Sequence, residues 1–169
     1  MKGVTSMLNF LCILLVALFA SLPMAATVHP QNTALAATFE DDGYTGAWVE
    51  SKGLSIEVFL PEGWSGEDRS DSEGPYFSAA GDKVALEVHP ESEKVSDLVK
   101  QSSDPQGNLT FESAQANGLD AALARRADGL TVVVPCGPKA YRFDFHFDAP
   151  EALSESMALR IAGSCTDLW

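Results

Sequence analysis

The sequence has few basic residues, few cysteines and few histidines. It contains 11 Lys and Arg against 24 Asp and Glu, which gives a formal net charge of −13, with three cysteines and three histidines. A charge of this sign repels nucleic-acid phosphates and anionic lipid headgroups, so the composition excludes nucleic acid and polybasic membrane binding. Cys-x-x-Cys and Gly-x-Ser-x-Gly motifs are also missing. We therefore predict neither dithiol redox catalysis nor a serine hydrolase.

Only one long hydrophobic run is present, and it stands near the start of the chain. It extends over residues 7–22, follows a single lysine and ends at Pro23. Small residues come next and no cluster of Lys or Arg does, a pattern typical of a cleavable signal peptide. We predict a signal peptide over residues 1–26, cleaved after Ala26, with a second suitable site after Ala36. The expected product is secreted or extracytoplasmic and has no membrane span, whereas an uncleaved N-terminal anchor is the alternative.

The chain after the predicted cleavage site is long enough for one domain and too short for two. We predict that residues 27–43, which are mostly small and polar, are disordered and that residues 44–169 form a single domain. Cys136 and Cys165 remain in this domain. An even number of cysteines in an exported chain favours a disulfide, here closing a loop of 29 residues. The alternative is a pair of small buried thiols that do not meet.

Alternating apolar and polar residues predict several β-strands. The clearest strand lies at residues 141–147, where one side carries four aromatic residues and the other carries Arg142, Asp144, His146 and then Asp148. Four aromatic side chains on one side of a strand indicate the centre of the core. The aromatic residues are Tyr141, Phe143, Phe145 and Phe147. Further strands are predicted at residues 54–60, 84–89, 109–117, 119–123 and 130–134, with turns at Asn117-Gly118 and Asp128-Gly129.

Two segments have helical spacing instead. Residues 93–102 contain a short apolar stripe, and a second stripe runs from Leu153 to Cys165. Asp148 and Glu151 have the spacing of a capping box for this second helix. Each stripe must be buried, and the aromatic side of the sheet is the available partner for the C-terminal helix. We therefore predict an α+β fold, in which a C-terminal helix and a short mid-chain helix pack on an antiparallel, twisted sheet.

The order of these elements resembles that of the PsbP/Mog superfamily, which includes exported bacterial proteins of the DcrB type. The residues that carry the resemblance are a strand entering a Pro-x-x-Trp turn at residues 54–64, the mid-chain helix, the Asn117-Gly118 turn and a final helix ending at Ser164. The resemblance covers roughly residues 45–166. It implies an accessory or binding module and carries no site residues with it.

Polar residues at three places are candidates for a site. His89 has carboxylates on both sides in the sequence, and His146 shares one side of its strand with Asp144 and Asp148. Either histidine could contribute to a divalent metal site or belong to a solvated strand. Residues 62–73 hold five carboxylates without the ligand order of a calcium loop. We predict a mobile, solvated loop there and no metal or cofactor in the protein.

The remaining candidates are binding residues. Arg125 and Arg126 could hold an anionic ligand or pair with the surplus of carboxylates, and Trp64 and Tyr76 could line a groove or pack in the core. Since no catalytic set is present, we predict a non-catalytic exported binding or accessory protein whose ligand, a protein or a small molecule, is unknown. The alternative function is a metal-assisted extracytoplasmic enzyme that uses His89 or His146 with nearby carboxylates.

Overall fold

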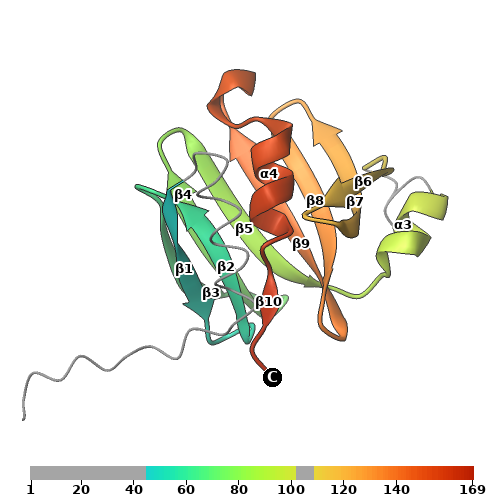
Figure 1. Ribbon diagram of the computed structural model, residues 1–169, viewed down its shortest axis with the longest axis horizontal. Helices are drawn as coiled ribbons and strands as arrows, with labels where there is room; N and C mark the ends of the chain where they lie inside the picture. The colour runs from blue at the N-terminus through green and yellow to red at the C-terminus, as the bar shows by residue number, and fades with distance from the viewer. Residues whose placement is uncertain (1–44, 102–108) are drawn as a thin grey trace, which may run out of the picture. The chain divides into compact units, whose positions relative to one another are not determined.

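The computed structural model describes residues 45–101 and 109–169 (Figure 1). The predicted signal peptide and the segment 27–43 lie outside the described residues, as does Tyr44. Neither described helix is long and apolar enough to cross a membrane.

Seven of the described strands form one antiparallel sheet, which we call the large sheet. Its central strand is the aromatic strand predicted from the sequence. Three strands joined by hairpin turns lie on each side of it. In spatial order the strands are β3 (Ser65–Ser70), β4 (Pro75–Gly81), β5 (Val84–Glu91), β9 (Lys139–Phe147), β8 (Gly129–Cys136), β7 (Leu119–Arg126) and β6 (Glu112–Ala116).

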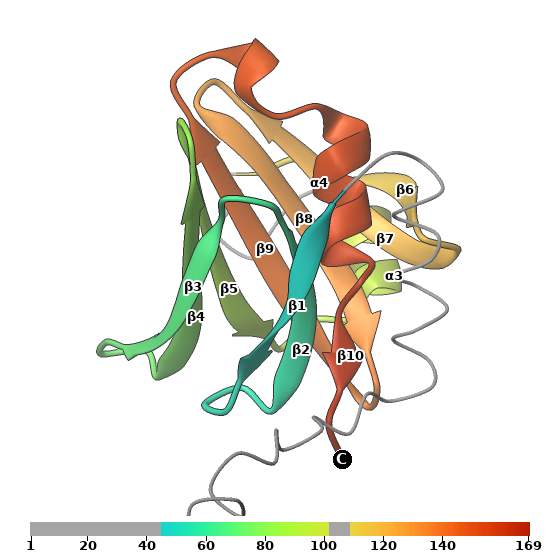
Figure 2. The same ribbon diagram turned by 60° about the vertical axis from the view of Figure 1, so that its left-hand side comes forward.

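A second, three-stranded sheet and a helix lie together on one side of the large sheet (Figure 2). This small sheet contains β1 (Gly46–Ser51), β2 (Ile56–Pro61) and β10 (Thr166–Asp167), all antiparallel, and the helix is α4 (Glu155–Ala162). A 3-10 turn, η1 (Pro150–Ala152), precedes α4. The short helix α3 (Val95–Gln101) follows β5 and contacts β7 and β8.

The core lies between the large sheet and the layer made by the small sheet and α4. Period-two alternation sends every second side chain of each strand to this inner side, and the aromatic side of β9 is buried there as predicted, with Phe143 and Phe145 inaccessible to solvent. Leu153 and Ile161 of the predicted helical stripe are buried in the same cluster. Other members include Ile56, Val58, Leu60, Phe77, Leu86, Val88, Val132, Val134, Tyr141 and Ala158.

A smaller cluster lies on the opposite, outer side of the large sheet. Here Leu98 of α3 is buried together with Ala122 and Ala124 of β7 and Val133 of β8. These residues occupy the alternate positions of their strands, so β7 and β8 are apolar on both sides. Strands buried on both sides lose the simple alternation, which explains the continuous apolar run on β8.

The predicted α+β class is wrong, because the described residues are mostly β. Strands contain 55% of them and helices only 15%. Residues 62–73, predicted as a loop, contain the strand β3, which pairs with β4 along its whole length. The sequence Ser-Gly-Glu-Asp-Arg-Ser has no apolar alternation, so the partner strand, not its own pattern, makes it a strand.

The start of the C-terminal helix is also different from the prediction. Its N-cap is Ser154, whose hydroxyl accepts the backbone N–H of Met157, whereas Asp148 precedes the 3-10 turn. Pro150 begins the 3-10 turn, where its missing N–H costs no helical hydrogen bond, and the extended residues Leu153 and Ser154 separate this turn from α4. The Asn117-Gly118 turn is confirmed, since both residues have positive φ. The second turn lies one residue earlier than predicted, because Gly129 already pairs in β8.

Candidate functional site

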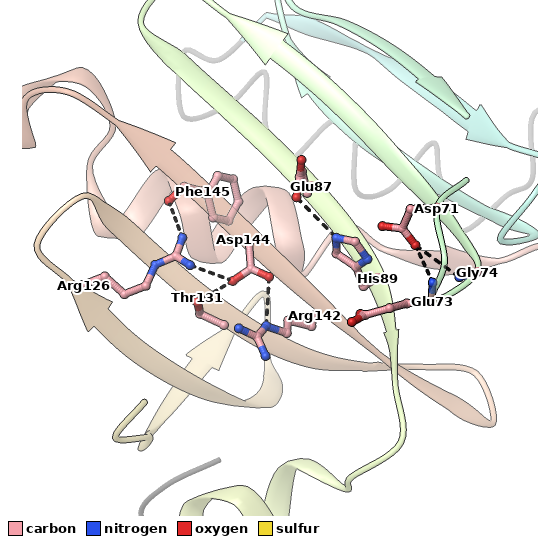
Figure 3. Close-up of polar contacts among 10 residues, drawn as sticks. All are labelled: Asp71, Glu73, Gly74, Glu87, His89, Arg126, Thr131, Arg142, Asp144 and Phe145. Atoms are coloured by element: carbon pink, nitrogen blue, oxygen red, sulfur yellow. Dashed lines mark hydrogen bonds and ion pairs between the residues drawn. The ribbon is translucent and has the colours of Figure 1, made fainter. Parts of the chain in front are cut away.

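The outer side of the large sheet has a covered half and an open half. α3 covers the half made by β7 and β8. Over β3, β4, β5 and β9 most outward side chains are polar, and many reach solvent; the side chains of Glu87 and His89 are 45% and 25% exposed. We call this half the open polar face, and Figure 3 shows its central residues.

Strand register arranges the open polar face in two rows. The first row runs across four strands and contains Arg69, Tyr76, His89 and Arg142. The second row contains Glu67, Ser78, Glu87, Asp144 and Thr131. A basic and aromatic row therefore lies beside an acidic and hydroxyl row, so the face offers donors and acceptors at close spacing.

Asp144 is the centre of the polar contacts on β9 and its neighbours (Figure 3). Its side chain is 10% exposed, and it accepts hydrogen bonds from Thr131 Oγ1 at 2.6 Å, Arg142 Nε at 2.9 Å and Arg126 Nη1 at 3.3 Å. Arg126 also donates to the carbonyl oxygen of Phe145 at 3.2 Å. A carboxylate this deeply buried needs such donors, and in return it fixes both guanidinium groups on the sheet.

His89 and Tyr76 form a stacked pair on β5 and β4. Their ring centroids are 5.0 Å apart and their planes differ by 14°. His89 Nε2 lies 3.4 Å from Glu87 Oε2 on the same strand. The pair places two stacked rings on the open polar face, and Arg142 is the cross-strand neighbour of His89 on its other side.

The two described histidines do not share a site. His146 Nδ1 lies 3.7 Å from Asp128 Oδ2, in a separate shallow pocket that also includes Lys83 and Asp148. Among the described residues, no three His, Cys, Asp or Glu side chains are grouped so that they could hold a metal ion. Each of the two described histidines has one carboxylate within ion-pair distance, Glu87 for His89 and Asp128 for His146.

Two of the four predicted binding residues lie on the outer side of the large sheet and two do not. Tyr76 is on the open polar face, and Arg126 of β7 lies at its border, where its guanidinium reaches Asp144. Arg125 points to the opposite side of β7, where it bonds Glu112 Oε1 at 2.7 Å and Glu155 Oε2 at 2.8 Å, and these hydrogen bonds raise the pKa of its guanidinium. Trp64 packs against the core and covers Gly81, where a Cβ atom would come within 2.2 Å of its indole nitrogen.

Residues 62–74, which we call the acidic hairpin, lie at the edge of the open polar face. Hydrogen bonds to their own carboxylates stabilise the conformation of this segment. Asp68 accepts hydrogen bonds from Ser51 Oγ at 2.5 Å and from the backbone N–H of Gly53 at 3.0 Å, which ties β3 to the small sheet. Asp71 accepts the N–H groups of Glu73 and Gly74 in the turn. Short side chains of this type commonly close turns in this way.

Cys136 and Cys165 meet on the inner side, away from the open polar face. Their sulfur atoms are 2.6 Å apart, and both residues are present as buried thiols. Burial, followed by the contact with Cys136, raises the pKa of the Cys165 thiol. The disulfide stays a prediction, but the two residues lie close enough for a bond without movement of the chain.

Thr131 and Arg142 are the site residues that sequence reasoning did not select. Thr131 is inaccessible to solvent and stands within the apolar run of β8, where it is the polar exception. A buried hydroxyl usually has a hydrogen-bond partner. A threonine within an apolar strand therefore indicates a polar partner on a neighbouring strand, which here is Asp144.

No protein-family model matches this chain, and no curated protein does. The resemblance to the PsbP/Mog superfamily therefore stays a prediction.

Proposed function

We propose that this protein is an exported, non-catalytic binding module and that the open polar face is its docking surface for another protein. The observation that carries the proposal is the Asp144 network. It holds Arg142 on the central strand beside the Tyr76 and His89 stack, and it holds the guanidinium of Arg126, which reaches Asp144 from β7. Tyrosine and arginine are enriched among the residues that dominate binding energy at protein interfaces.

The chemistry of the face also favours binding over catalysis. Each described histidine contacts a carboxylate, Glu87 or Asp128, and the nucleophilic thiols lie on the other side of the sheet. A pre-organised arginine loses little side-chain entropy when a partner binds. The two-row arrangement would give a partner a fixed register, because its acidic groups must meet one row and its donors the other.

A photo-crosslinking amino acid at position 76 tests the proposal. We expect a discrete adduct with a partner protein in cells that produce this protein, and loss of the adduct when Arg142→Glu is added. The matched control places the same amino acid at Trp169, an aromatic position that is 91% exposed. Equal adducts from both positions, or an adduct that persists with Arg142→Glu, would contradict the docking surface.

Elemental analysis separates this proposal from the metal-assisted enzyme. We expect no stoichiometric transition metal in protein purified without chelators. A stoichiometric metal that disappears in His89→Ala or His146→Ala would replace the docking proposal by the enzyme.

A further inference from the structure

A hollow lies along α3, on the covered half of the outer side of the large sheet. This α3 groove has a volume of about 820 Å³ and is bounded by α3, the end of β5, the start of β7 and the β8–β9 turn. Its apolar surface comes from Val95 and Val99 of α3 and from Pro135, Pro138 and Ala140 opposite them. A volume of this order is typical of sites for small organic molecules.

Lysines surround the α3 groove although the protein is strongly acidic. Lys94, Lys100 and Lys139 line it, which is half of the six lysines in a chain with net charge −13. Lys100 forms an exposed pair with Asp97 at 3.7 Å. Within the described residues, Lys94 and Lys139 have no carboxylate within ion-pair distance. The arginines on β3, β7 and β9, by contrast, are all paired with carboxylates.

Two carboxylates also line the α3 groove, and both are engaged locally. Glu91 accepts the backbone N–H of Glu93 at 3.0 Å. Asp120 accepts the side-chain amide of Gln115 at 2.6 Å. When Asp97, the partner of Lys100, is counted as well, three lysines face three carboxylates, so the cationic part of the rim consists of Lys94 and Lys139.

We propose that the α3 groove binds a small organic anion with an apolar body, such as an aliphatic carboxylate. The valine and proline walls would contact the aliphatic part, and the ammonium groups of Lys94 and Lys139 would pair with the carboxylate. The site is separate from the open polar face and does not depend on the docking proposal.

Decanoate, decanol and decyltrimethylammonium are matched probes, because they share a chain and differ in headgroup charge. Titrating each into isotope-labelled protein and following backbone amide shifts locates the binding site. We expect decanoate to shift amides of α3 and residues 135–140, decanol to bind there more weakly and decyltrimethylammonium to bind more weakly still. Shifts elsewhere, or a cation that binds as tightly as decanoate, would overturn the proposal.

Charge-neutral variants test the role of the lysines. Lys94→Gln with Lys139→Gln removes two contacts at an exposed rim, where each ion pair contributes little, and should weaken decanoate binding on the order of tenfold in total. The matched control is Lys52→Gln with Lys83→Gln, which changes the net charge equally at two turns outside the α3 groove. An equal loss in both variants would show that decanoate responds only to overall charge.

Discussion

Phe143 and Asp144 are neighbours on β9 and lie on opposite sides of the large sheet. Phe143 is held by apolar packing from the small sheet and from the strands beside it, and no solvent reaches it. Asp144 is held by three hydrogen bonds from Thr131, Arg126 and Arg142. The inner side is thus fixed by area removed from water, whereas the open polar face is fixed by a few directional contacts.

This difference indicates that the inner side contributes most of the folding stability and that the open polar face can serve binding. Burial of apolar area is the dominant favourable contribution to folding, and hydrogen bonds to charged groups contribute about 1.5–3 kcal/mol each at most. Substitutions on the inner side should therefore unfold the protein, while those on the open polar face should change binding before they change folding.

The largest effect is expected for Phe143→Ala. Removing a fully buried phenylalanine leaves a cavity between the two layers, and the free energy of unfolding should fall by about 3–5 kcal/mol. Urea denaturation measures this change. The matched control is His146→Ala, which truncates a ring on the other side of the same strand, 41% exposed, and should cost less than about 0.5 kcal/mol. Similar losses for both variants would contradict the division between the two sides.

The predicted disulfide between Cys136 and Cys165 is the next largest contribution on the inner side. Closing a loop of 29 residues should stabilise the folded protein by about 3–4 kcal/mol through the entropy of the unfolded chain. Unfolding with and without reductant measures the difference, and Cys136→Ser with Cys165→Ser should match the reduced protein. Two alkylatable thiols in protein recovered from outside the cell would rule out the bond.

On the open polar face, Asp144→Asn tests whether the network matters for folding. The amide oxygen can still accept one hydrogen bond, but two guanidinium groups lose their counter-charge, so we expect a loss of about 1–3 kcal/mol in the free energy of unfolding. Glu87→Gln, on the adjacent strand and in the same row, is the control and should change stability by less than about 0.5 kcal/mol. If Asp144→Asn lowered the free energy of unfolding as much as Phe143→Ala does, the open polar face would contribute to stability as strongly as the core.

Tyr141 predicts a pH dependence confined to strongly alkaline conditions. Burial raises the pKa of its phenol to about 12, and the hydroxyl donates to the carbonyl oxygen of Leu54 at 3.0 Å. Because the folded pKa lies above the unfolded value of about 10, this contribution to stability is complete below pH 10 and is lost as the pH rises toward 12. Absorbance at 295 nm should show a phenolate transition near pH 12 that Tyr141→Phe removes. A Tyr141 transition near pH 10 in folded protein would contradict its burial.

The strands with apolar alternation could be predicted from the sequence, and the others could not. The aromatic side of β9 is the clear case, since every second residue carries the signal. β3 contains no apolar residue, and its pairing with β4 and its contacts through Asp68 depend on residues elsewhere in the chain. That strand, together with β1, β4 and β10, is missing from the predicted strands, and these additional strands make the fold mostly β.

The candidate site was predicted only in part for a similar reason. Arg125 and Arg126 are adjacent in the sequence, and only the phase of β7 sends one to α4 and the other to Asp144. The sequence does indicate which side of the sheet each arginine faces, because Ala121 and Leu123 are buried on the inner side and Arg125 follows them in the same alternation. The partners of Arg126 come from β8 and β9, and no local pattern predicts which residues on them face each other.

The smallest expected effect is that of calcium on the acidic hairpin at the edge of the open polar face. Its five carboxylates are spread along the hairpin, and most already accept hydrogen bonds. Glu62 accepts from Thr45, Glu67 pairs with Arg69, Asp68 holds Ser51 and Gly53, and Asp71 closes the turn beside Glu73. A calcium site needs six to eight oxygen ligands around one point, which these contacts would have to release.

We therefore expect a few millimolar calcium to raise the melting temperature no more than the same concentration of magnesium, because only screening of the net charge is available to either ion. Differential scanning calorimetry with both ions measures this. Asp68→Ala and Asp71→Ala each remove hydrogen bonds and lower the melting temperature by themselves, so the quantity to compare is the difference between the two ions within each variant. A calcium-selective rise in the original protein that vanishes in both variants would show that the hairpin binds calcium. The edge of the open polar face would then be held by a metal ion, in addition to the directional contacts described above.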